Sequence, residues 1–331
     1  MKKTSLLLAL LGSSLVSNAQ TAAEASQSRI QGTQREQPAP ITGQNIAAQN
    51  AEATSPSESD TGAQRPISLK KSGISSFFGY DTKVFYRDNP LSVDNALSEY
   101  KTGMWTNTFF GGAGLGVFDM DDAIITPYIG GSYVINDYLE DKIEEDFGGL
   151  NYNSTSAYAL LLAQFSNGWS GRIGVSYAMD KNTESDTEEY SEIFPNIGIM
   201  KTYTLSSGTV AVFDAYVGKH ASTSFAGPGE STDTLDNLEV AASYGLVHRQ
   251  GVFIVKPKYL LSFKSYENGL LNSNRDDLTH NLSVKIDYPF ADSLTLSLFS
   301  GYTIRETSGY SLGGDYENFD GGFGLTLNSR F

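Results

Sequence analysis

Histidine is the side chain in this sequence best suited to proton transfer, and the chain has three, His220, His248 and His280. His220 lies near Asp214 and Ser222 in the sequence, and these are residue types from which hydrolases build a nucleophile and its base. The spacing matches no hydrolase motif of a membrane barrel. Because the chain has no Cys, it offers no thiolate nucleophile, no thiolate metal site and no disulfide. We therefore predict a protein that is not an enzyme, with no catalytic residue, cofactor or metal site.

Basic side chains offer a different chemistry, which is the electrostatic attraction of anions. Seven of them alternate with apolar residues, so each would lie on the polar face of an extended segment. These residues are Lys83, Arg172, Lys256, Lys258, Lys264, Lys285 and Arg305. Such residues act together only if the surrounding elements bring them to one surface, so the organisation of the chain decides their role.

The first nineteen residues have the layout of a secretory signal peptide. Lys2 and Lys3 precede an apolar run from Leu6 to Val16, and small residues up to Ala19 form a candidate cleavage site. The run is shorter than the roughly 20 apolar residues of a membrane-spanning helix. We assign residues 1–19 to a cleaved signal peptide and expect export. The acidic net charge of −15 argues against a nucleic-acid partner.

Residues 20–73 have a different composition, rich in Ala, Gln, Ser, Thr and Pro and without any Phe, Tyr or Trp. Such a segment buries too little apolar surface to offset the entropy of ordering it. We predict a disordered, low-complexity periplasmic extension. The functional alternatives are a plug inside a pore or a contact with the cell wall.

From residue 74 to residue 331 the sequence alternates apolar and polar residues and is interrupted by turns, which is typical of half-exposed strands. Lengths near ten to thirteen residues suit tilted strands that cross a bilayer. We predict twelve strands, with ten to fourteen allowed: 75–86, 105–117, 124–135, 153–165, 169–178, 193–204, 209–219, 238–248, 252–264, 278–288, 294–305 and 319–331.

Short and long connections alternate strictly along these strands, as in an outer-membrane barrel. The long connections are predicted at residues 87–104, 136–152, 179–192, 220–237, 265–277 and 306–318. In hydrocarbon every backbone group must be paired, so such strands can cross only as a closed barrel. The fold class is therefore all-β, a transmembrane antiparallel up-and-down barrel.

The last strand ends in an aromatic residue preceded by apolar residues at alternate positions, namely Phe323, Leu325, Leu327 and Phe331. With the signal peptide and the even set of amphipathic strands, this ending resembles that of Gram-negative outer-membrane β-barrel proteins, porin-like in general kind and of no specific family. The resemblance implies location in the bacterial outer membrane. It also implies recognition of the terminal strand by the barrel-assembly machinery, and lipid and lipopolysaccharide as further partners.

In such a barrel the seven basic residues face the lumen, among small and polar side chains. This arrangement favours a passive, mildly anion-preferring diffusion pore for small hydrophilic solutes. Placing the extension and Phe331 in the periplasm puts the acidic long loops outside. A non-conducting structural or adhesive protein that acts through these loops is therefore the alternative, and a lipid-modifying hydrolase is the least favoured one.

Overall fold

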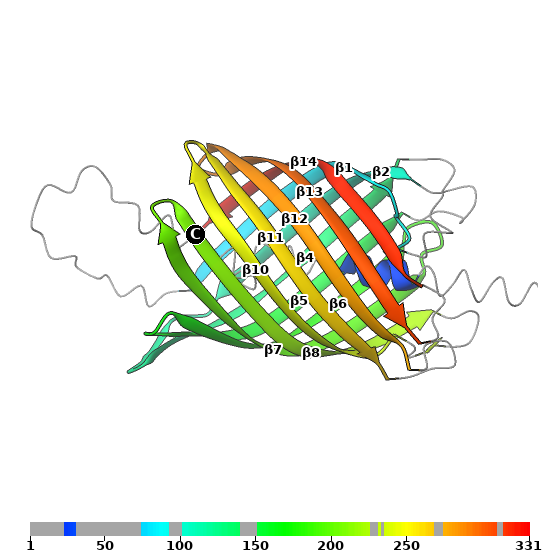
Figure 1. Ribbon diagram of the computed structural model, residues 1–331, viewed down its shortest axis with the longest axis horizontal. Helices are drawn as coiled ribbons and strands as arrows, with labels where there is room; N and C mark the ends of the chain where they lie inside the picture. The colour runs from blue at the N-terminus through cyan, green and yellow to red at the C-terminus, as the bar shows by residue number, and fades with distance from the viewer. Residues whose placement is uncertain are drawn as a thin grey trace, which may run out of the picture.

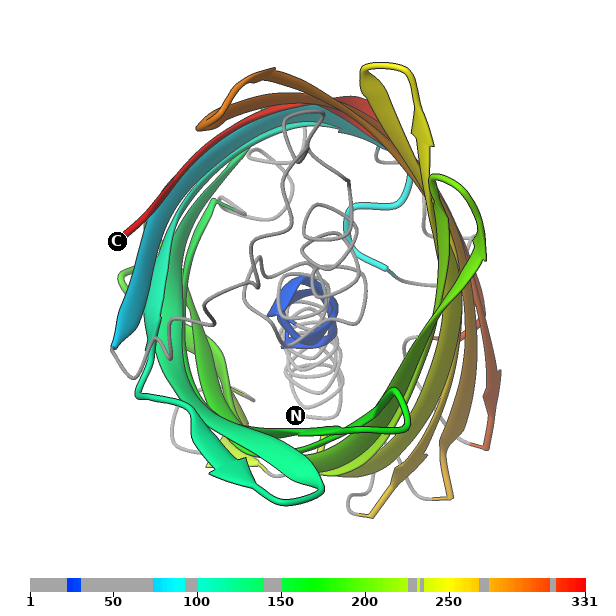
Figure 2. The same ribbon diagram turned by 90° about the vertical axis from the view of Figure 1, so that its left-hand side faces the viewer.

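The wall of the molecule is a single antiparallel sheet that closes on itself. The computed structural model describes residues 23–30, 74–92, 101–139, 151–225, 231–232, 235–267, 274–309 and 314–331. Twelve long strands form the wall, and β1 pairs with β14 from Phe77 opposite Arg330 to Arg87 opposite Asp320. This pairing closes the barrel seen in Figures 1 and 2 and leaves its strands without an unpaired edge.

The strands of the wall agree closely with the predicted ones. They are β1 (Ser75–Arg87), β2 (Thr102–Gly114), β4 (Ala123–Tyr138), β5 (Tyr152–Phe165), β6 (Trp169–Asn182), β7 (Glu188–Ser206), β8 (Thr209–Phe225), β10 (Asn237–Gln250), β11 (Phe253–Tyr266), β12 (Asp276–Ala291), β13 (Leu294–Ser308) and β14 (Tyr316–Arg330). The short strands β3 (Phe118–Met120) and β9 (Ser231–Thr232) only extend the edges of β4 and β8. The fold class is thus confirmed.

Three of the short connections turn through a glycine with a positive φ: Gly168 (φ 81°), Gly208 (φ 79°) and Gly251 (φ 62°). Only glycine adopts this backbone region without steric cost, which is why it is the usual residue of tight hairpins. Figure 1 shows the hairpin turns between these strands at the same end of the barrel as the C-terminus.

Several strands extend further toward the long connections than predicted. The connection predicted at 179–192 is reduced to residues 183–187, because β6 and β7 continue their pairing on either side of it. As a result Asp180 and Glu192, which the sequence places in an acidic outer loop, are buried strand residues inside the barrel. Asp277, expected in the next-to-last long loop, is likewise buried, at the start of β12.

The outer face of the barrel is apolar around its whole circumference. Large side chains such as Ile173, Ile197 and Leu282 are more than half exposed, at 57%, 56% and 58%. A soluble monomer rarely presents such a continuous apolar surface to water, whereas a bilayer requires it. Six aromatic residues near strand ends fall on the outward face by alternation, and the structure divides them: Tyr86, Trp105, Tyr177 and Tyr203 are exposed, whereas Trp169 and Tyr288 are half-buried.

One short helix occupies the lumen, and we call residues 23–30 the luminal helix. Figure 2, viewed along the barrel, shows it enclosed by the wall, and Figure 1 places it toward the end of the barrel opposite the C-terminus. All of its residues except Ser28 are buried. The prediction of disorder for 20–73 is therefore wrong for residues 23–30. The remainder of that segment and the predicted signal peptide lie outside the described residues.

The helix forms because the sequence supplies Ala, Glu, Gln and Arg, which are good helix formers. Eight residues are too few for a stable helix in water, so contacts with the wall hold it. The helix is too short and polar to span a membrane, and no helix of the described residues is long and apolar enough to do so.

Candidate functional site: the luminal cavity and the helix beside it

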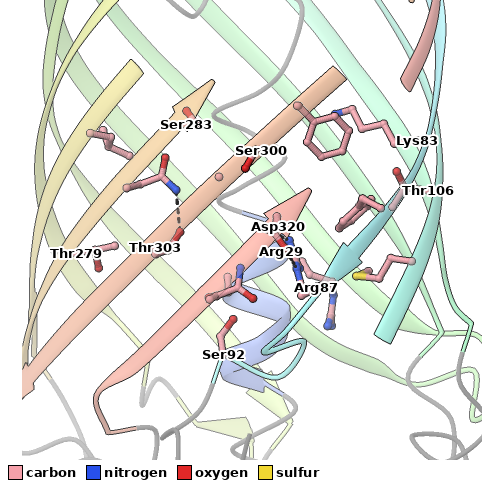
Figure 3. A pocket seen from close by; sticks show the side chains of 18 of the residues that line it. Arg29, Lys83, Arg87, Ser92, Thr106, Thr279, Ser283, Ser300, Thr303 and Asp320 are labelled. Atoms are coloured by element: carbon pink, nitrogen blue, oxygen red, sulfur yellow. Dashed lines mark hydrogen bonds and ion pairs between the residues drawn. The ribbon is translucent and has the colours of Figure 1, made fainter. Parts of the chain in front are cut away.

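A cavity of about 440 Å³ lies inside the barrel, between the luminal helix and part of the wall. Its wall is built by β1, β2, β4 and β11 to β14, and Gln27, Ser28 and Arg29 contribute from the helix. Figure 3 shows side chains from both sides converging on it, including Arg29, Ser92, Ser283 and Thr303. Polar residues such as these reach the cavity because inward and outward side chains alternate along every strand.

The opposite side of the lumen is partly closed by apolar packing. Tyr158, Leu160, Leu162, Met200, Val212 and Val247 form a buried cluster on β5, β7, β8 and β10. The sequence predicts a lumen lined mainly by small and polar residues, and this cluster departs from that expectation. The polar space is therefore confined to one side of the barrel.

Basic side chains outnumber acidic ones around the cavity. Eight Lys and Arg residues line it, against three Asp residues. Six of the seven basic residues singled out by alternation are among them, namely Lys83, Lys256, Lys258, Lys264, Lys285 and Arg305. The seventh, Arg172 on β6, is absent from the cavity lining and pairs with Asp214 on β8. Strand alternation thus locates these side chains well, but it does not reveal their partners.

Several of the basic residues contact carboxylates of the same wall. Lys256 Nζ lies 2.7 Å from Asp287 Oδ2, and Lys285 Nζ lies 3.6 Å from the other oxygen of the same carboxylate. Arg87 makes a two-pronged contact with Asp320, at 2.7 and 3.1 Å. These pairs reduce the local excess of positive charge and rigidify the wall, because paired charges inside a protein hold each other in place.

The first turn of the luminal helix binds the wall through a carboxylate. The Nη1 of Arg275, just before β12, donates to Glu24 Oε1 at 2.9 Å, and its Nη2 lies 3.4 Å from Oε2. Arg305 Nη2 lies 3.7 Å from the same Oε2. Arg275 also donates two hydrogen bonds to Asp277, at 2.9 and 2.8 Å. Burial opposes ionisation of Arg275, but Tyr266 and Glu24 raise its pKa above the ordinary value, so it stays charged.

The last turn of the helix binds the wall through a cation. Arg29 Nε donates to Asp180 Oδ2 at 3.0 Å, and Nη1 donates to the Tyr138 hydroxyl at 3.1 Å. Its guanidinium lies over the Tyr152 ring, 3.8 Å from the centroid. Burial opposes the charge of Arg29, yet Tyr138 and Asp180 keep its pKa above the usual range. The helix is therefore fixed at both ends by buried ion pairs.

The middle of the helix joins a second buried network, around His220. The Gln27 amide donates to the Tyr190 hydroxyl at 3.3 Å, and Tyr190 donates to Glu192 Oε2 at 2.7 Å. His220 lies between Glu192 and Glu239, with each ring nitrogen 2.9 Å from a carboxylate oxygen. These contacts link β7, β8 and β10 to the helix.

The His220 arrangement lacks the geometry of a hydrolase. Both ring nitrogens contact carboxylates, so neither is placed to take a proton from a nucleophile. His248 contacts Thr209 and Gln250, and His280 contacts Tyr259, an outward-facing residue. In the described part of the chain, no group of three His, Asp or Glu side chains is arranged to hold a metal ion.

The terminal strand presents its predicted signal residues outward. Phe323 is 70% exposed and Phe331 80%, while Leu325 is half-buried and Leu327 exposed. Phe331 also continues the pairing with β1, since its backbone NH donates to Ser76 O at 2.9 Å. The role of these residues in barrel assembly remains an expectation, which the outward placement makes accessible to a partner.

Sequence reasoning missed the helix and its partners: Glu24, Gln27, Arg29, Asp180 and Arg275. The helix was missed because of the kind of contacts that hold it. The helix contributes only Ala23 and Ile30 to a buried apolar cluster and is otherwise held by charged and amide side chains, so it lacks the broad apolar stripe by which hydrophobic periodicity reveals a helix. The run Ala22-Ala23-Glu24-Ala25 is the one local hint.

Comparison with known proteins gives only a likeness of fold. The chain matches no protein-family model, and it matches no curated protein. Similar solved structures include the β domain of the Bordetella autotransporter BrkA (11% identity, 78% of this chain, 100% of that chain, TM-score 0.39). Another is an anion-selective porin from Comamonas acidovorans (9% identity, 78% of this chain, 99% of that chain, TM-score 0.39). A third is the NanC porin (8% identity, 75% of this chain, 98% of that chain, TM-score 0.42). At these values the likeness concerns barrel architecture and carries no argument about function.

Proposed function

We propose that the protein is a β-barrel of the bacterial outer membrane that provides a passive, mildly anion-preferring diffusion path for small hydrophilic solutes. The observation that carries the proposal is the polar luminal cavity, with its excess of basic over acidic side chains. Fixed positive charge in a narrow aqueous path lowers the barrier for anions and raises it for cations. The apolar outer face supports the membrane location, because lipid is the solvent that suits it.

A planar bilayer under a salt gradient tests this proposal. We expect discrete openings and a reversal potential shifted toward that of the anion. Replacing Lys256, Lys258 and Lys285 together with Gln should move the reversal potential toward zero, because all three line the cavity. The matched control replaces Arg249, an exposed residue of β10 outside the cavity lining, with Gln. Channels whose selectivity is the same in both variants would contradict the proposed role of the lining.

The luminal helix favours a second candidate function, a barrel that does not conduct in its resting state. Its buried, ion-paired ends obstruct part of the lumen. A folded barrel that never conducts, in the full-length protein and in a variant without residues 20–31, would favour a structural or adhesive role for the outer loops.

A further inference from the structure

The contact between Glu24 and its two arginines has the form of a ligand in a binding site. One carboxylate, carried on a segment separate from the wall, meets the fork of Arg275 and the edge of Arg305. Arg275 and Glu24 are almost completely buried. Two parallel N–H···O contacts from a guanidinium are the geometry by which proteins recognise carboxylates.

The charge balance of this cluster depends on Glu24. With it present, two guanidinium groups face two carboxylates, because Asp277 contacts both Arg275 and Arg305. Without it, the two guanidinium groups face the carboxylate of Asp277, and the buried Lys264, which lies opposite Asp277 in the sheet, adds a further positive charge. An uncompensated charge in such a place is strongly unfavourable, so departure of the helix requires either an influx of water or a replacement anion.

The cluster is reachable from the cavity. Arg305 and Asp277 line it, as do Tyr266 and Ser92, and the Ser92 carbonyl accepts a hydrogen bond from Arg305 Nη2 at 3.3 Å. Gln27, Ser28 and Arg29 border the same space from the helix. A solute inside the cavity therefore meets the arginine that contacts Glu24.

We propose that Arg275 and Arg305 form a carboxylate-binding site that Glu24 fills in the resting barrel. A solute carrying a carboxylate competes with Glu24 for this site and thereby releases the luminal helix. A carboxylate replaces both the charge and the planar shape that leave with Glu24, whereas tetrahedral sulfate replaces only the charge. This inference deepens the proposed diffusion function by naming its substrate class as organic acids, and for the passage of solute it rests on that function.

The absence of Cys in the chain allows a direct test. The test uses the protein without residues 1–19, refolded in lipid vesicles, with Ser28 replaced by Cys. Ser28 is the half-buried helix residue that borders the cavity. The rate of modification by a small neutral maleimide reports helix release. Glutarate, which reproduces the end of a Glu side chain, should accelerate labelling in a saturable manner, by about tenfold for a typical coupling between two sites. Pentane-1,5-diol, and sulfate at equal ionic strength, should not.

Variants separate the site from general effects of charge. With Arg305→Gln added, glutarate should no longer accelerate labelling, whereas with Arg249→Gln the response should be that of the parent. With Glu24→Gln, labelling should be fast without glutarate. If Arg305→Gln fails to fold, calorimetry of E24Q provides the second measurement, because removing the internal competitor should tighten glutarate binding.

The outcomes distinguish this proposal from the pore function. Equal acceleration by glutarate and sulfate, or no acceleration together with no glutarate binding to E24Q, overturns the carboxylate site. Acceleration of labelling without any channel opening in the same glutarate solution leaves the site standing and contradicts the diffusion function. Openings without acceleration contradict the site alone.

Discussion

At the scale of single residues, the ion pair between Arg29 and Asp180 is the clearest case of two groups that depend on each other's burial. Both side chains are nearly inaccessible to water, and Asp180 also accepts a hydrogen bond from Ser154. Removing one partner of such a pair costs about 3–5 kcal/mol, because it leaves the other charge buried alone.

We therefore expect Asp180→Asn to lower the free energy of unfolding, and Arg29→Met to do the same. The double variant should lose less than the two single losses combined, since neither charge then remains unpaired. Urea unfolding in lipid vesicles, followed by tryptophan fluorescence, measures all four proteins of the cycle. Additive losses, within about 0.5 kcal/mol, would mean that the two side chains do not interact in the folded barrel.

Strand alternation identifies which residues point inward, because a period of two is the geometry of the strand itself. Lys83, Lys256 and Lys285 were placed in this way, and the structure puts all three along the cavity. Strand alternation does not identify the partners of these side chains, however. Arg29 and Asp180 are 151 positions apart, and their contact depends on where an isolated helix docks within a closed sheet, which no local pattern records.

At the scale of elements, the strands were predictable because each must turn an apolar face to lipid and satisfy its backbone through two neighbours. The luminal helix was not predictable in this way, because ion pairs at both ends and only two apolar residues, Ala23 and Ile30, hold it against the wall. We expect deletion of residues 20–31 to leave a barrel with unchanged heat-modifiable mobility on a gel, because the pairing of β1 with β14 does not involve the helix. Channel conductance should rise, since an element is removed from the lumen (Figure 2).

A synthetic peptide of residues 21–32, added to the deletion variant, should lower the conductance again. A peptide of the same composition in scrambled order is the matched control, because it keeps the net charge and loses the spacing of Glu24 and Arg29. Equal conductance of the deletion variant and the full-length protein would show that the helix does not obstruct the conducting path.

At the scale of the whole molecule, the barrel separates two solvents across one layer of sheet. Leu282 and Ser283 are neighbours near the middle of β12, and they face opposite ways. Leu282 is 58% exposed on the outer surface, where it lies opposite Tyr259 and Tyr302 of the adjacent strands. Ser283 lines the cavity, where Figure 3 shows it among polar side chains.

The same substitution at these two positions should therefore destabilise the barrel to very different degrees. Leu282→Lys places a charge in hydrocarbon, at a cost of about 2–4 kcal/mol near the bilayer midplane. Ser283→Lys places it in a cavity with room and polar neighbours but directly opposite Lys258, so the free energy of unfolding should fall by about 1 kcal/mol, less than the cost in hydrocarbon. Urea titration in phosphocholine vesicles compares the two variants directly. Similar losses at both positions would contradict the assignment of the outer face to lipid, because only contact with hydrocarbon makes the two sides of one strand so unequal for a single lysine.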